Sequence, residues 1–545
     1  MNMEPIQVST CILAIVLGVT GHLGLLIHSE WDVYAFPILA TLGLGPAVVL
    51  FLLAGAGYSN AFWLTLNAVV SFDASLCLSI AVYRYFFHAL RRFPGPKLAR
   101  ISALWSIKAA VVDAKWHLRV QELHRQYGTF VRIKPREISI DDPAAIKAIH
   151  GPGTSCVKGP FYDLNYPHHS LQMTRDKAFH SKRRRLWDRG FTPRALAGYE
   201  PFILDHCRVL VELISSRAPH KQEVNELIAG FTWDSMGILA FGKSFNMLQG
   251  APPSNIQQMK DLGRIASVLQ CASWIAQLVR NSPGLRAKNQ LWLNWCSEQL
   301  EKRKKMELDH KDLFSYLIDG ALANYEGQTK SEIDQDLVYD SELVITAGSD
   351  TTAATVSALL YLLAQHPDKL QKLQQEVDSC VSAGETITHA ALAGKPWLES
   401  CINEGLRMYP SVASGVPRET GPEGLMVAGV YIPPRTIVST PTYAIHRDPR
   451  NSVDPDSFVP ERWSSKPEMI LCKEAFKSFS SGKYACAGKQ FAMMEMRLVV
   501  ATIVKNFDLE FPPGEGQEPL EKVGHGVLDC FTAHIPDYHL IFRPR

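Results

Sequence analysis

The first 90 residues hold three long apolar stretches, and no lysine or arginine occurs before Arg84. The stretches cover residues 8–27, 35–55 and 63–83, and each approaches the roughly 20 residues that a helix needs to cross a bilayer. A cleaved signal peptide does not fit, because no basic segment precedes the first stretch and the apolar sequence continues far beyond it. The sequence therefore predicts a transmembrane anchor over residues 1–90.

Basic residues arrive together right after the anchor, at positions 84, 91, 92, 97 and 100. Such a cluster stays on the cytoplasmic side of a membrane. We therefore expect the rest of the chain to be cytoplasmic and, with three spans, the N-terminus to lie in the lumen. The prolines of RRFPGPKLAR, residues 91–100, stop a helix and stiffen the chain. They predict a hinge between the anchor and a domain over residues 101–545.

The composition argues against several other classes of protein. The formal net charge is only +2 and 46% of the residues are hydrophobic, which gives no reason to expect a nucleic-acid partner. The 11 cysteines are scattered and form no CxxC pair, so a disulfide framework or a zinc module is not expected.

Helical patterns dominate the chain after the hinge. The longest proline-free pattern covers residues 331–365, and Pro367 stands where a further helix can begin. A shorter helix is expected over residues 397–408. Strand patterns are few and short, and they cover residues 130–140 (a hairpin), 424–434 and 436–440. The predicted fold class is mainly α with a small β portion.

Cys486 stands between two glycines in FSSGKYACAGKQFAMMEMRLVV, residues 479–500, directly before a segment without glycine or proline. A thiolate is a strong, soft metal ligand, and backbone N–H groups and a helix N-terminus stabilise it. Gly482 and Gly488 are expected to permit a tight turn and a close backbone approach. We interpret the segment as a loop that offers the Cys486 sulfur to a ligand. The alternative is a buried cysteine at an ordinary helix start.

This segment resembles the cysteine loop of the cytochrome P450 family. Phe479, Gly482, Cys486 and Gly488 match the family signature FxxGx(R)xCxG, in which the cysteine is the axial thiolate ligand of haem iron. The resemblance implies a haem cofactor bound by Cys486, in a cytochrome P450 fold that follows the transmembrane anchor. One position departs from the signature, because Tyr484 replaces the arginine that pairs with a haem propionate.

Two further segments match the family in its order. Glu404 and Arg407 in SCINEGLRMYP stand three residues apart on one face of a predicted helix, where an acid and a base can pair. DPDSFVPERW, residues 454–463, resembles the family segment PERF and contributes Arg462. The resemblance implies that these three charged residues form a buried structural network behind the haem, because a buried charge needs partners.

The longest predicted helix carries AGSDTT, residues 347–352, which matches the family segment (A/G)Gx(D/E)T(T/S). Glycine, aspartate and threonine are poor helix formers, and a threonine hydroxyl can bond back to the preceding turn. The resemblance implies that Gly348 leaves room for a ligand on iron, that Thr351 hydrogen-bonds dioxygen and that Asp350 delivers protons. The alternative is a tolerated defect in the helix.

Three more residues are candidate partners of the haem propionates. His180 and Arg184 in AFHSKRRRLW stand four apart and resemble the family's helix that contacts the propionates, although a solvated basic face would show the same pattern. Arg418 follows Arg407 by eleven residues, where relatives often place another such partner.

The resemblance implies a membrane-anchored haem-thiolate monooxygenase of the endoplasmic reticulum, with its catalytic domain on the cytoplasmic side. Such an enzyme takes electrons from NADPH through a separate flavoprotein reductase and inserts one oxygen atom of O₂ into a small apolar organic substrate. The segments VKGPFYDL, AFGKSF and GKQFAMMEMRL resemble filamentous-fungal members of secondary metabolism, which implies a terpenoid, indole alkaloid or polyketide. The alternatives are a haem-thiolate isomerase or dehydratase, and a non-enzymatic membrane-tethered haem sensor.

Overall fold

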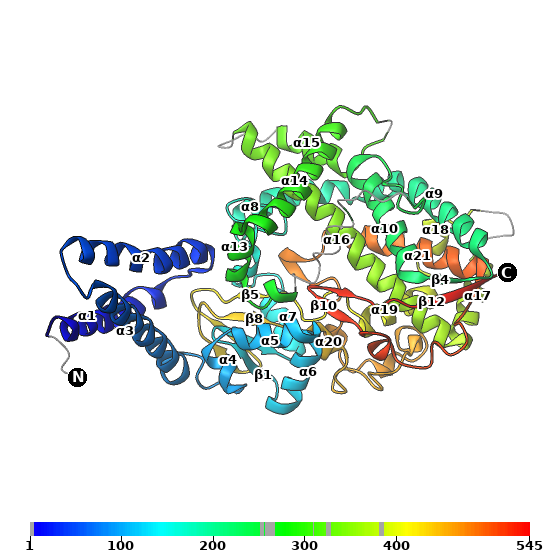
Figure 1. Cartoon of the computed structure of the whole chain (residues 1–545). Helices are drawn as coiled ribbons and strands as arrows, with labels where there is room; N and C mark the ends of the chain where they lie inside the picture. Colours follow the sequence, from blue (N-terminus) through cyan, green and yellow to red (C-terminus); the bar gives the residue numbers. More distant parts are fainter. Residues whose placement is uncertain (1–4, 251–255, 257–266, 309, 323–328, 381–385) are drawn as a thin grey trace.

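A computed structural model describes residues 5–250, 256, 267–308, 310–322, 329–380 and 386–545 (Figure 1). Three N-terminal helices project from one side of a larger body, namely α1 (Pro5–Gly24), α2 (Ala35–Gly55) and α3 (Ala61–Val82). Each is long and apolar enough to cross a membrane, and α3 packs against both of the others. The three helices fall on the three stretches for which the sequence predicts spans.

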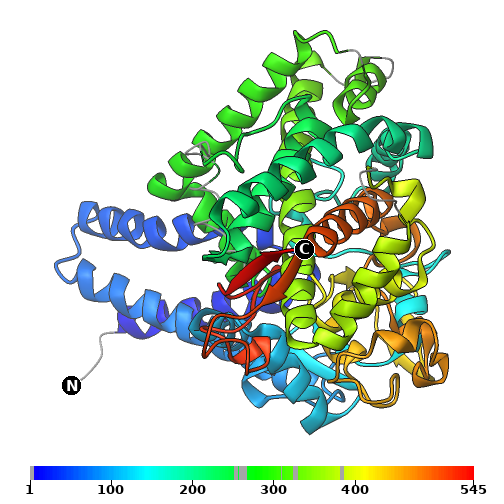
Figure 2. The ribbon, with the colours of Figure 1, turned by 90° about the vertical axis from the view of Figure 1, so that its right-hand side faces the viewer.

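Helix α16 (Lys330–Gln365) runs through the middle of the larger body, which Figure 2 shows from a second side. Its length and apolarity also suit a membrane span, but 67% of its apolar segment is buried inside the protein, against 17%, 0% and 6% for the three N-terminal helices. Four helices pack around it, namely α10 (Val224–Phe241), α14 (Pro283–Lys304), α19 (Pro396–Met408) and α21 (Lys489–Asn506). The predicted long central helix is confirmed.

The other helices build the outer layers of the body. They are α4 (Lys97–Ile101), α5 (Leu104–Asp113), α6 (Trp116–Tyr127), α7 (Pro143–His150), α8 (Lys177–Gly190), α9 (Pro193–Arg217), α13 (Ser273–Asn281), α15 (Leu313–Leu322), α17 (Pro367–Cys380), α18 (His389–Leu392) and α20 (Thr442–His446). Pro367 begins α17 as predicted, because proline suits the first helical position, where its missing N–H is not needed.

Strands form a small part of the fold. The largest sheet has the order β1-β2-β8-β5-β3, and its strands are β1 (Phe130–Lys134), β2 (Glu137–Ile140), β8 (Ile437–Ser439), β5 (Arg418–Glu419) and β3 (Val157–Lys158). The β1–β2 hairpin is antiparallel and β8 joins β2 in parallel. A three-stranded sheet has the order β4-β12-β9, with strands β4 (Lys221–Glu223), β12 (His539–Pro544) and β9 (Phe507–Glu510). Two further sheets have two strands each. One joins β6 (Leu425–Val427) with β7 (Val430–Ile432), and the other joins β10 (Leu528–Cys530) with β11 (Thr532–His534). The predicted hairpin and the predicted strands after Gly424 are confirmed.

The segment expected to be a hinge, residues 91–100, is fixed to the sheet. The Arg132 N–H on β1 donates to the Pro94 carbonyl at 2.7 Å. Gly95 has a φ of +152°, and a Cβ there would lie 2.3 Å from the Arg132 carbonyl oxygen, so this approach requires glycine. Helix α4 then begins at Lys97. The three N-terminal helices are therefore joined to the body by a packed connection.

The turn between α1 and α2, residues 25–34, also contacts the body. The Glu30 carboxylate accepts hydrogen bonds from Arg136 at 2.7 Å and from Arg175 at 2.6 Å. Arg175 also pairs with Glu419 at 2.9 Å. We call Glu30, Arg136, Arg175 and Glu419 the membrane clasp. It joins the β1–β2 turn, the segment before α8 and β5 to the N-terminal helices.

Candidate functional site

The loop before α21 presents Cys486 on a tightly folded backbone. The Cys486 N–H donates to the Phe479 carbonyl at 3.0 Å. Gly482 has a φ of +68°, and a Cβ there would lie 2.0 Å from the His150 carbonyl oxygen, so glycine is required. Gly488 differs, because its φ is −84° and the nearest atom to an added Cβ would be 3.9 Å away. The protein alone therefore does not require glycine at position 488, and the expected close approach of a ligand there stays a prediction.

The thiol of Cys486 is in an environment with opposing effects on its pKa. All 11 cysteines are free, and Cys486 is one of two that are exposed. Although its side chain is accessible, Cys486 is closely surrounded by chain, and this desolvation raises its pKa more than the Gly488 N–H, Arg184 and Lys489 lower it. Arg184 also donates from Nη1 to the Ala485 carbonyl at 2.6 Å. A cation and a backbone donor thus lie where a thiolate would need them.

Side chains from distant segments converge on the phenol of Tyr484. Lys158 Nζ and Arg418 Cζ each lie 5.1 Å from the centre of the Tyr484 ring. The His180 ring meets the phenol edge-on, with 4.7 Å between centroids. Together with Arg184, which lowers the pKa of Lys158, these residues form what we call the Tyr484 cluster. The structure therefore brings together three propionate partners expected from the sequence and adds Lys158.

Within the described residues, no carboxylate pairs with Lys158 or Arg418, although both are buried. Burial and the neighbouring cations lower the pKa of Lys158 to about 6 and that of His180 to about 3. The Tyr484 hydroxyl, His180 Nδ1 and Arg418 Nε are buried without a hydrogen-bond partner. Buried positive charge with free donors suits an anion with several oxygens. The two carboxylates of haem fit this donor set.

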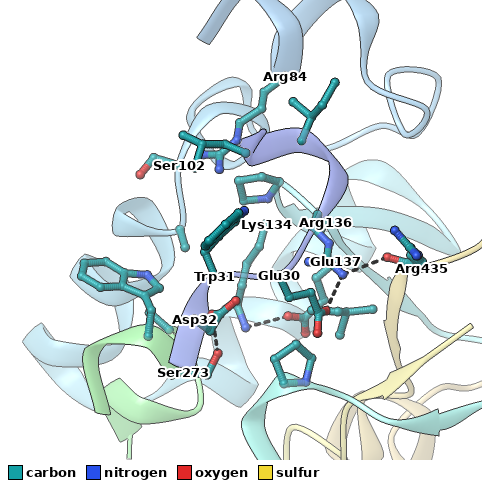
Figure 3. Close-up of a pocket in the computed structure, with 18 of the residues that line it drawn as sticks. Glu30, Trp31, Asp32, Arg84, Ser102, Lys134, Arg136, Glu137, Ser273 and Arg435 are labelled. Carbon is teal, nitrogen blue, oxygen red and sulfur yellow. Dashed lines mark hydrogen bonds and ion pairs between the residues drawn. The ribbon is translucent and has the colours of Figure 1, made fainter. Parts of the chain in front are cut away.

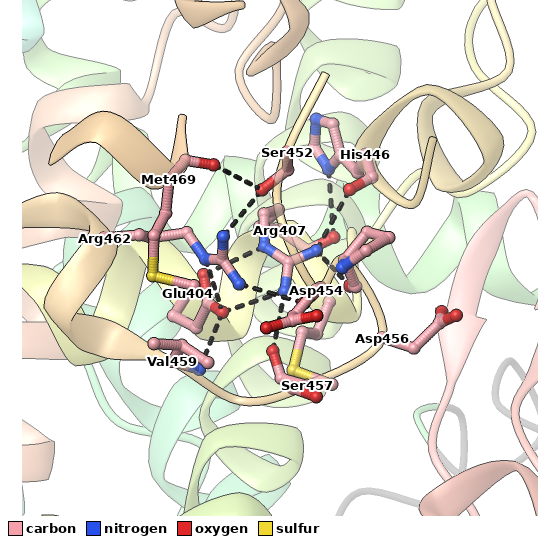
Figure 4. A network of polar contacts seen from close by, with 12 residues as sticks. Glu404, Arg407, His446, Ser452, Asp454, Asp456, Ser457, Val459, Arg462 and Met469 are labelled. Atoms are coloured by element: carbon pink, nitrogen blue, oxygen red, sulfur yellow. Dashed lines mark hydrogen bonds and ion pairs between the residues drawn. The ribbon is translucent and has the colours of Figure 1, made fainter. Parts of the chain in front are cut away.

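A second group of charges includes two residues of α19 and is closed on itself (Figure 4). Glu404 accepts hydrogen bonds from Arg407 at 2.8 and 2.9 Å and from Arg462 at 3.0 Å. The Trp463 indole N–H and the Val459 N–H also donate hydrogen bonds to this carboxylate, each at 2.9 Å. Burial raises the pKa of Glu404, but the two arginines outweigh it and the pKa is lowered. We call Glu404, Arg407 and Arg462 the Glu404 network.

Thr351 lies where α16 meets the segment after α19. Its Oγ1 donates to the Ala347 carbonyl at 2.8 Å, which is the back bond expected from the sequence. The Thr351 carbonyl in turn accepts from Ser411 Oγ at 2.9 Å and from Thr355 Oγ1 at 3.0 Å. The backbone carbonyls of this turn therefore bond to side chains and to a neighbouring segment as well as to the helix.

Gly348 lies against α10. A Cβ at this position would lie 2.4 Å from Met236 Sδ. The missing side chain is therefore needed for the close packing of α16 against α10, and the room for a ligand on iron that the resemblance implies stays a prediction. Asp350 and Thr351 follow on the same helix.

Sequence reasoning missed Lys158 and Ser411. Lys158 lies in β3, more than 300 residues before Tyr484, and no local pattern signals that the two will meet. Ser411 directly follows the segment SCINEGLRMYP, which the sequence analysis singled out. Its hydrogen bond to Thr351 was not predicted. The sequence alone could not single out either residue, because a lone lysine or serine on a loop or short strand has many ordinary roles.

Comparison with known proteins agrees with this site. The family model for cytochrome P450 matches residues 94–529. Cytochrome P450 monooxygenase nodW of Hypoxylon pulicicidum is 44% identical over 529 residues, which is 97% of both chains. Cytochrome P450 monooxygenase FCK2 of Fusarium pseudograminearum is 35% identical over 540 residues, also 97% of each. Tryprostatin B 6-hydroxylase of Aspergillus fumigatus is 35% identical over 452 residues, 82% of this chain and 80% of that one. The chain belongs to the cytochrome P450 monooxygenase family.

Proposed function

We propose that this protein is a membrane-anchored monooxygenase that inserts one oxygen atom into a small apolar substrate of fungal secondary metabolism. The observation that carries the proposal is the pairing of an exposed cysteine loop with the Tyr484 cluster, in which the buried side chains of Lys158 and Arg418 pair with no acid among the described residues. A terpenoid, indole alkaloid or polyketide substrate is supported by the fungal relatives, one of which is named for hydroxylating tryprostatin B.

Cys486 is the proposed axial ligand of haem. Haem, when bound, supplies the iron at which dioxygen is activated, and a thiolate ligand favours cleavage of the O–O bond. Phe479 and Gly482 hold the loop in shape, and Gly488 leaves the helix start free of a side chain. The five residues of the Tyr484 cluster would hold the haem carboxylates through charge and hydrogen bonds.

Asp350 and Thr351 are the proposed catalytic residues of α16. The Thr351 hydroxyl gives its hydrogen to the Ala347 carbonyl, so its oxygen is left to accept a hydrogen bond. Asp350 is half-buried and stands next to it in the chain, where a carboxyl can exchange protons with solvent. The Glu404 network is proposed to be structural, because its charges and donors are already satisfied.

The proposed electron source is an NADPH-dependent flavoprotein reductase that docks at the basic face of the cysteine loop, where Lys483 and Lys489 are exposed. The proposed anchor is residues 1–90, followed by the connection at 91–100 and the catalytic domain at 101–545. The membrane clasp supports this topology, because the α1–α2 turn and the end of α3 meet the same body. Three spans then put the N-terminus in the lumen of the endoplasmic reticulum and the body in the cytoplasm.

The reduced protein under carbon monoxide tests the cofactor. We expect the long-wavelength absorption of thiolate-ligated haem, and we expect Cys486→Ser to abolish it while Cys472→Ser, a change at a half-buried cysteine of a different loop, preserves it. With reductase and NADPH, Thr351→Ala should divert electrons into peroxide. Thr346→Ala is the matched control, since Thr346 makes the same back bond at 2.8 Å one turn earlier. Imidazole-type ligation or unchanged coupling in Thr351→Ala would contradict the proposal.

A further inference from the structure

A cavity with a volume of about 1000 Å³ lies between the N-terminal helices and the catalytic body (Figure 3). The membrane helices give it an apolar wall that includes Leu26, Leu39 and Ile80. The body gives it a polar wall that includes Lys134 and Arg136 on the β1–β2 turn. A cavity of this size accommodates a small organic molecule, and one wall is continuous with residues that face the bilayer.

The α1–α2 turn is held in place as one side of this cavity. Glu30 is bound on both oxygens by the membrane clasp, and Asp32 accepts from Ser273 Oγ of α13 at 2.8 Å. Arg435 donates from Nη1 to the His28 carbonyl at 3.1 Å. Bonds to four separate segments of the body fix the turn, so Trp31 between them has a defined position.

The chemistry of the polar wall favours a neutral ligand. Lys134 pairs with Glu137 at 2.7 Å, and Arg136 pairs with Glu30. Arg84 gives one N–H to the Ile101 carbonyl at 2.8 Å.

On the α1–α2 turn, which also lines the cavity, the buried Trp31 indole Nε1 has no hydrogen-bond partner among the described residues. An indole N–H only donates, so it suits a neutral molecule that carries a hydrogen-bond acceptor. A buried donor that stays unpaired costs free energy, and a ligand oxygen would relieve that cost.

The inner wall of the cavity leads toward α16. Phe161 lines it and stacks on Phe531, with 4.7 Å between centroids. Phe531 and Ser414 line a second, smaller cavity that shares Pro417 with the first. Ser411, three residues before Ser414, donates to the Thr351 carbonyl at 2.9 Å. The cavity thus lies between the bilayer side of the molecule and the central helix.

We propose that this cavity binds a neutral, largely apolar molecule with one hydrogen-bond acceptor, taken up from the bilayer, and that the Trp31 indole donates to the acceptor. This ligand is the substrate class of the monooxygenase before it reaches the site on α16, and in that respect the inference rests on the proposed function. The α1–α2 turn then has a role beyond anchoring, because it selects what enters.

Benzophenone is a suitable probe, since it is apolar, carries one carbonyl acceptor and labels its neighbours when irradiated. The full chain is reconstituted in phosphatidylcholine nanodiscs, irradiated with benzophenone and mapped by peptide mass spectrometry. We expect saturable labelling of the cavity walls. Leu39→Trp should lower it about tenfold, because the larger side chain takes the volume that the probe needs. Leu44→Trp is the matched control, on the same helix, exposed and outside the cavity lining.

Trp31→Phe tests the hydrogen bond separately. It should weaken benzophenone binding about fivefold, as expected for one neutral hydrogen bond. Diphenylmethane has the same two rings and no carbonyl. Its affinity, measured by competition with benzophenone labelling, should be the same in Trp31→Phe as in the original protein. Equal losses for the two compounds would contradict the role of the indole.

Two results would overturn the site itself. One is labelling spread evenly over the lipid-facing helices, with Leu39→Trp and Leu44→Trp behaving alike. The other is a phospholipid that native mass spectrometry finds bound to the original protein and lost in Leu39→Trp, which would assign the cavity to a bilayer lipid. The carbon monoxide spectrum of the same samples reports the haem site independently, so a failed thiolate assignment and a failed cavity give different results.

Discussion

The Glu404 network and the Tyr484 cluster both bury two basic side chains, yet they differ in what completes them. In the first, one carboxylate and several backbone oxygens satisfy Arg407 and Arg462. In the second, Lys158 and Arg418 have no acid partner among the described residues. In a closed network, the folded chain itself supplies a partner for every charge. In an open one, a bound ligand supplies the missing partners. The difference separates a structural network from a ligand site without reference to any motif.

The largest expected effect is the loss of Glu404, which opens the closed network. Glu404→Gln leaves Arg407 and Arg462 buried without a negative charge, and breaking such a group costs about 3–5 kcal/mol of unfolding free energy. We expect little folded protein, measured as haem-binding yield and as a lowered thermal midpoint. Glu461→Gln is the control, because Glu461 pairs with Lys369 nearer the surface. A similar loss of folded protein in both variants would show that the Glu404 network contributes no more to stability than the Glu461–Lys369 pair.

Arg418→Leu should act differently, because it removes a cation from the open cluster. The thermal midpoint of haem-free protein should hold or rise, since a buried unpaired charge is gone. Haem affinity should fall by about 3 kcal/mol, which is over a hundredfold, as for one partner of a buried charge pair. The measurement is the rate of haem transfer to excess apomyoglobin. Arg543→Leu, at an exposed strand residue, should change neither quantity. A loss of haem-free stability in Arg418→Leu would contradict the comparison.

Glu495 is an intermediate case, a fully buried acid on α21 without a cation. Burial raises its pKa to about 8, with a smaller opposing effect of the Thr352 and Ser235 hydroxyls. The folded state therefore binds more protons than the unfolded state between pH 4.5 and 8, and stability falls as pH rises through that range.

Between pH 6 and 8 the loss should be about 2 kcal/mol. Glu495→Gln should remove this part of the pH dependence, while Glu510→Gln, at an exposed surface pair, should not. The thermal midpoint of the full chain at the two pH values measures it. Parallel curves for the original protein and Glu495→Gln would show that the acid is charged in the folded state.

The parts of this molecule that the sequence predicts are those whose information is local. Three features could be predicted because each depends on residues of a single helix. They are the i, i+3 pair of Glu404 and Arg407, the proline that begins α17 and the long apolar pattern of α16. Arg462 was found because its segment matches a family pattern. Gly348 shows the limit of such patterns, since a motif marks the position but not which neighbour makes glycine necessary.

Contacts between distant segments could not be predicted in the same way. The membrane clasp joins Glu30 to Arg175 across 145 positions. The pairing of β3 with β5 sets Lys158 beside Arg418, and both lie against the Tyr484 ring. Opposite charges are frequent in any chain of this length, so the sequence offers too many possible pairs. Only the topology of the sheet decides which of them meet.

The smallest expected effect concerns the departure at Tyr484. If Lys158 supplies the charge that the family usually takes from the arginine at that position, Tyr484→Arg alone should change haem transfer less than about threefold. Lys158→Met should weaken haem binding by about 2 kcal/mol, and Tyr484→Arg in that background should recover most of it. The double-mutant cycle then gives a coupling of about 1 kcal/mol or more between residues that lie in contact. Strictly additive effects would show that Lys158 is not the substitute, and that the phenol holds its carboxylate by hydrogen bonding alone.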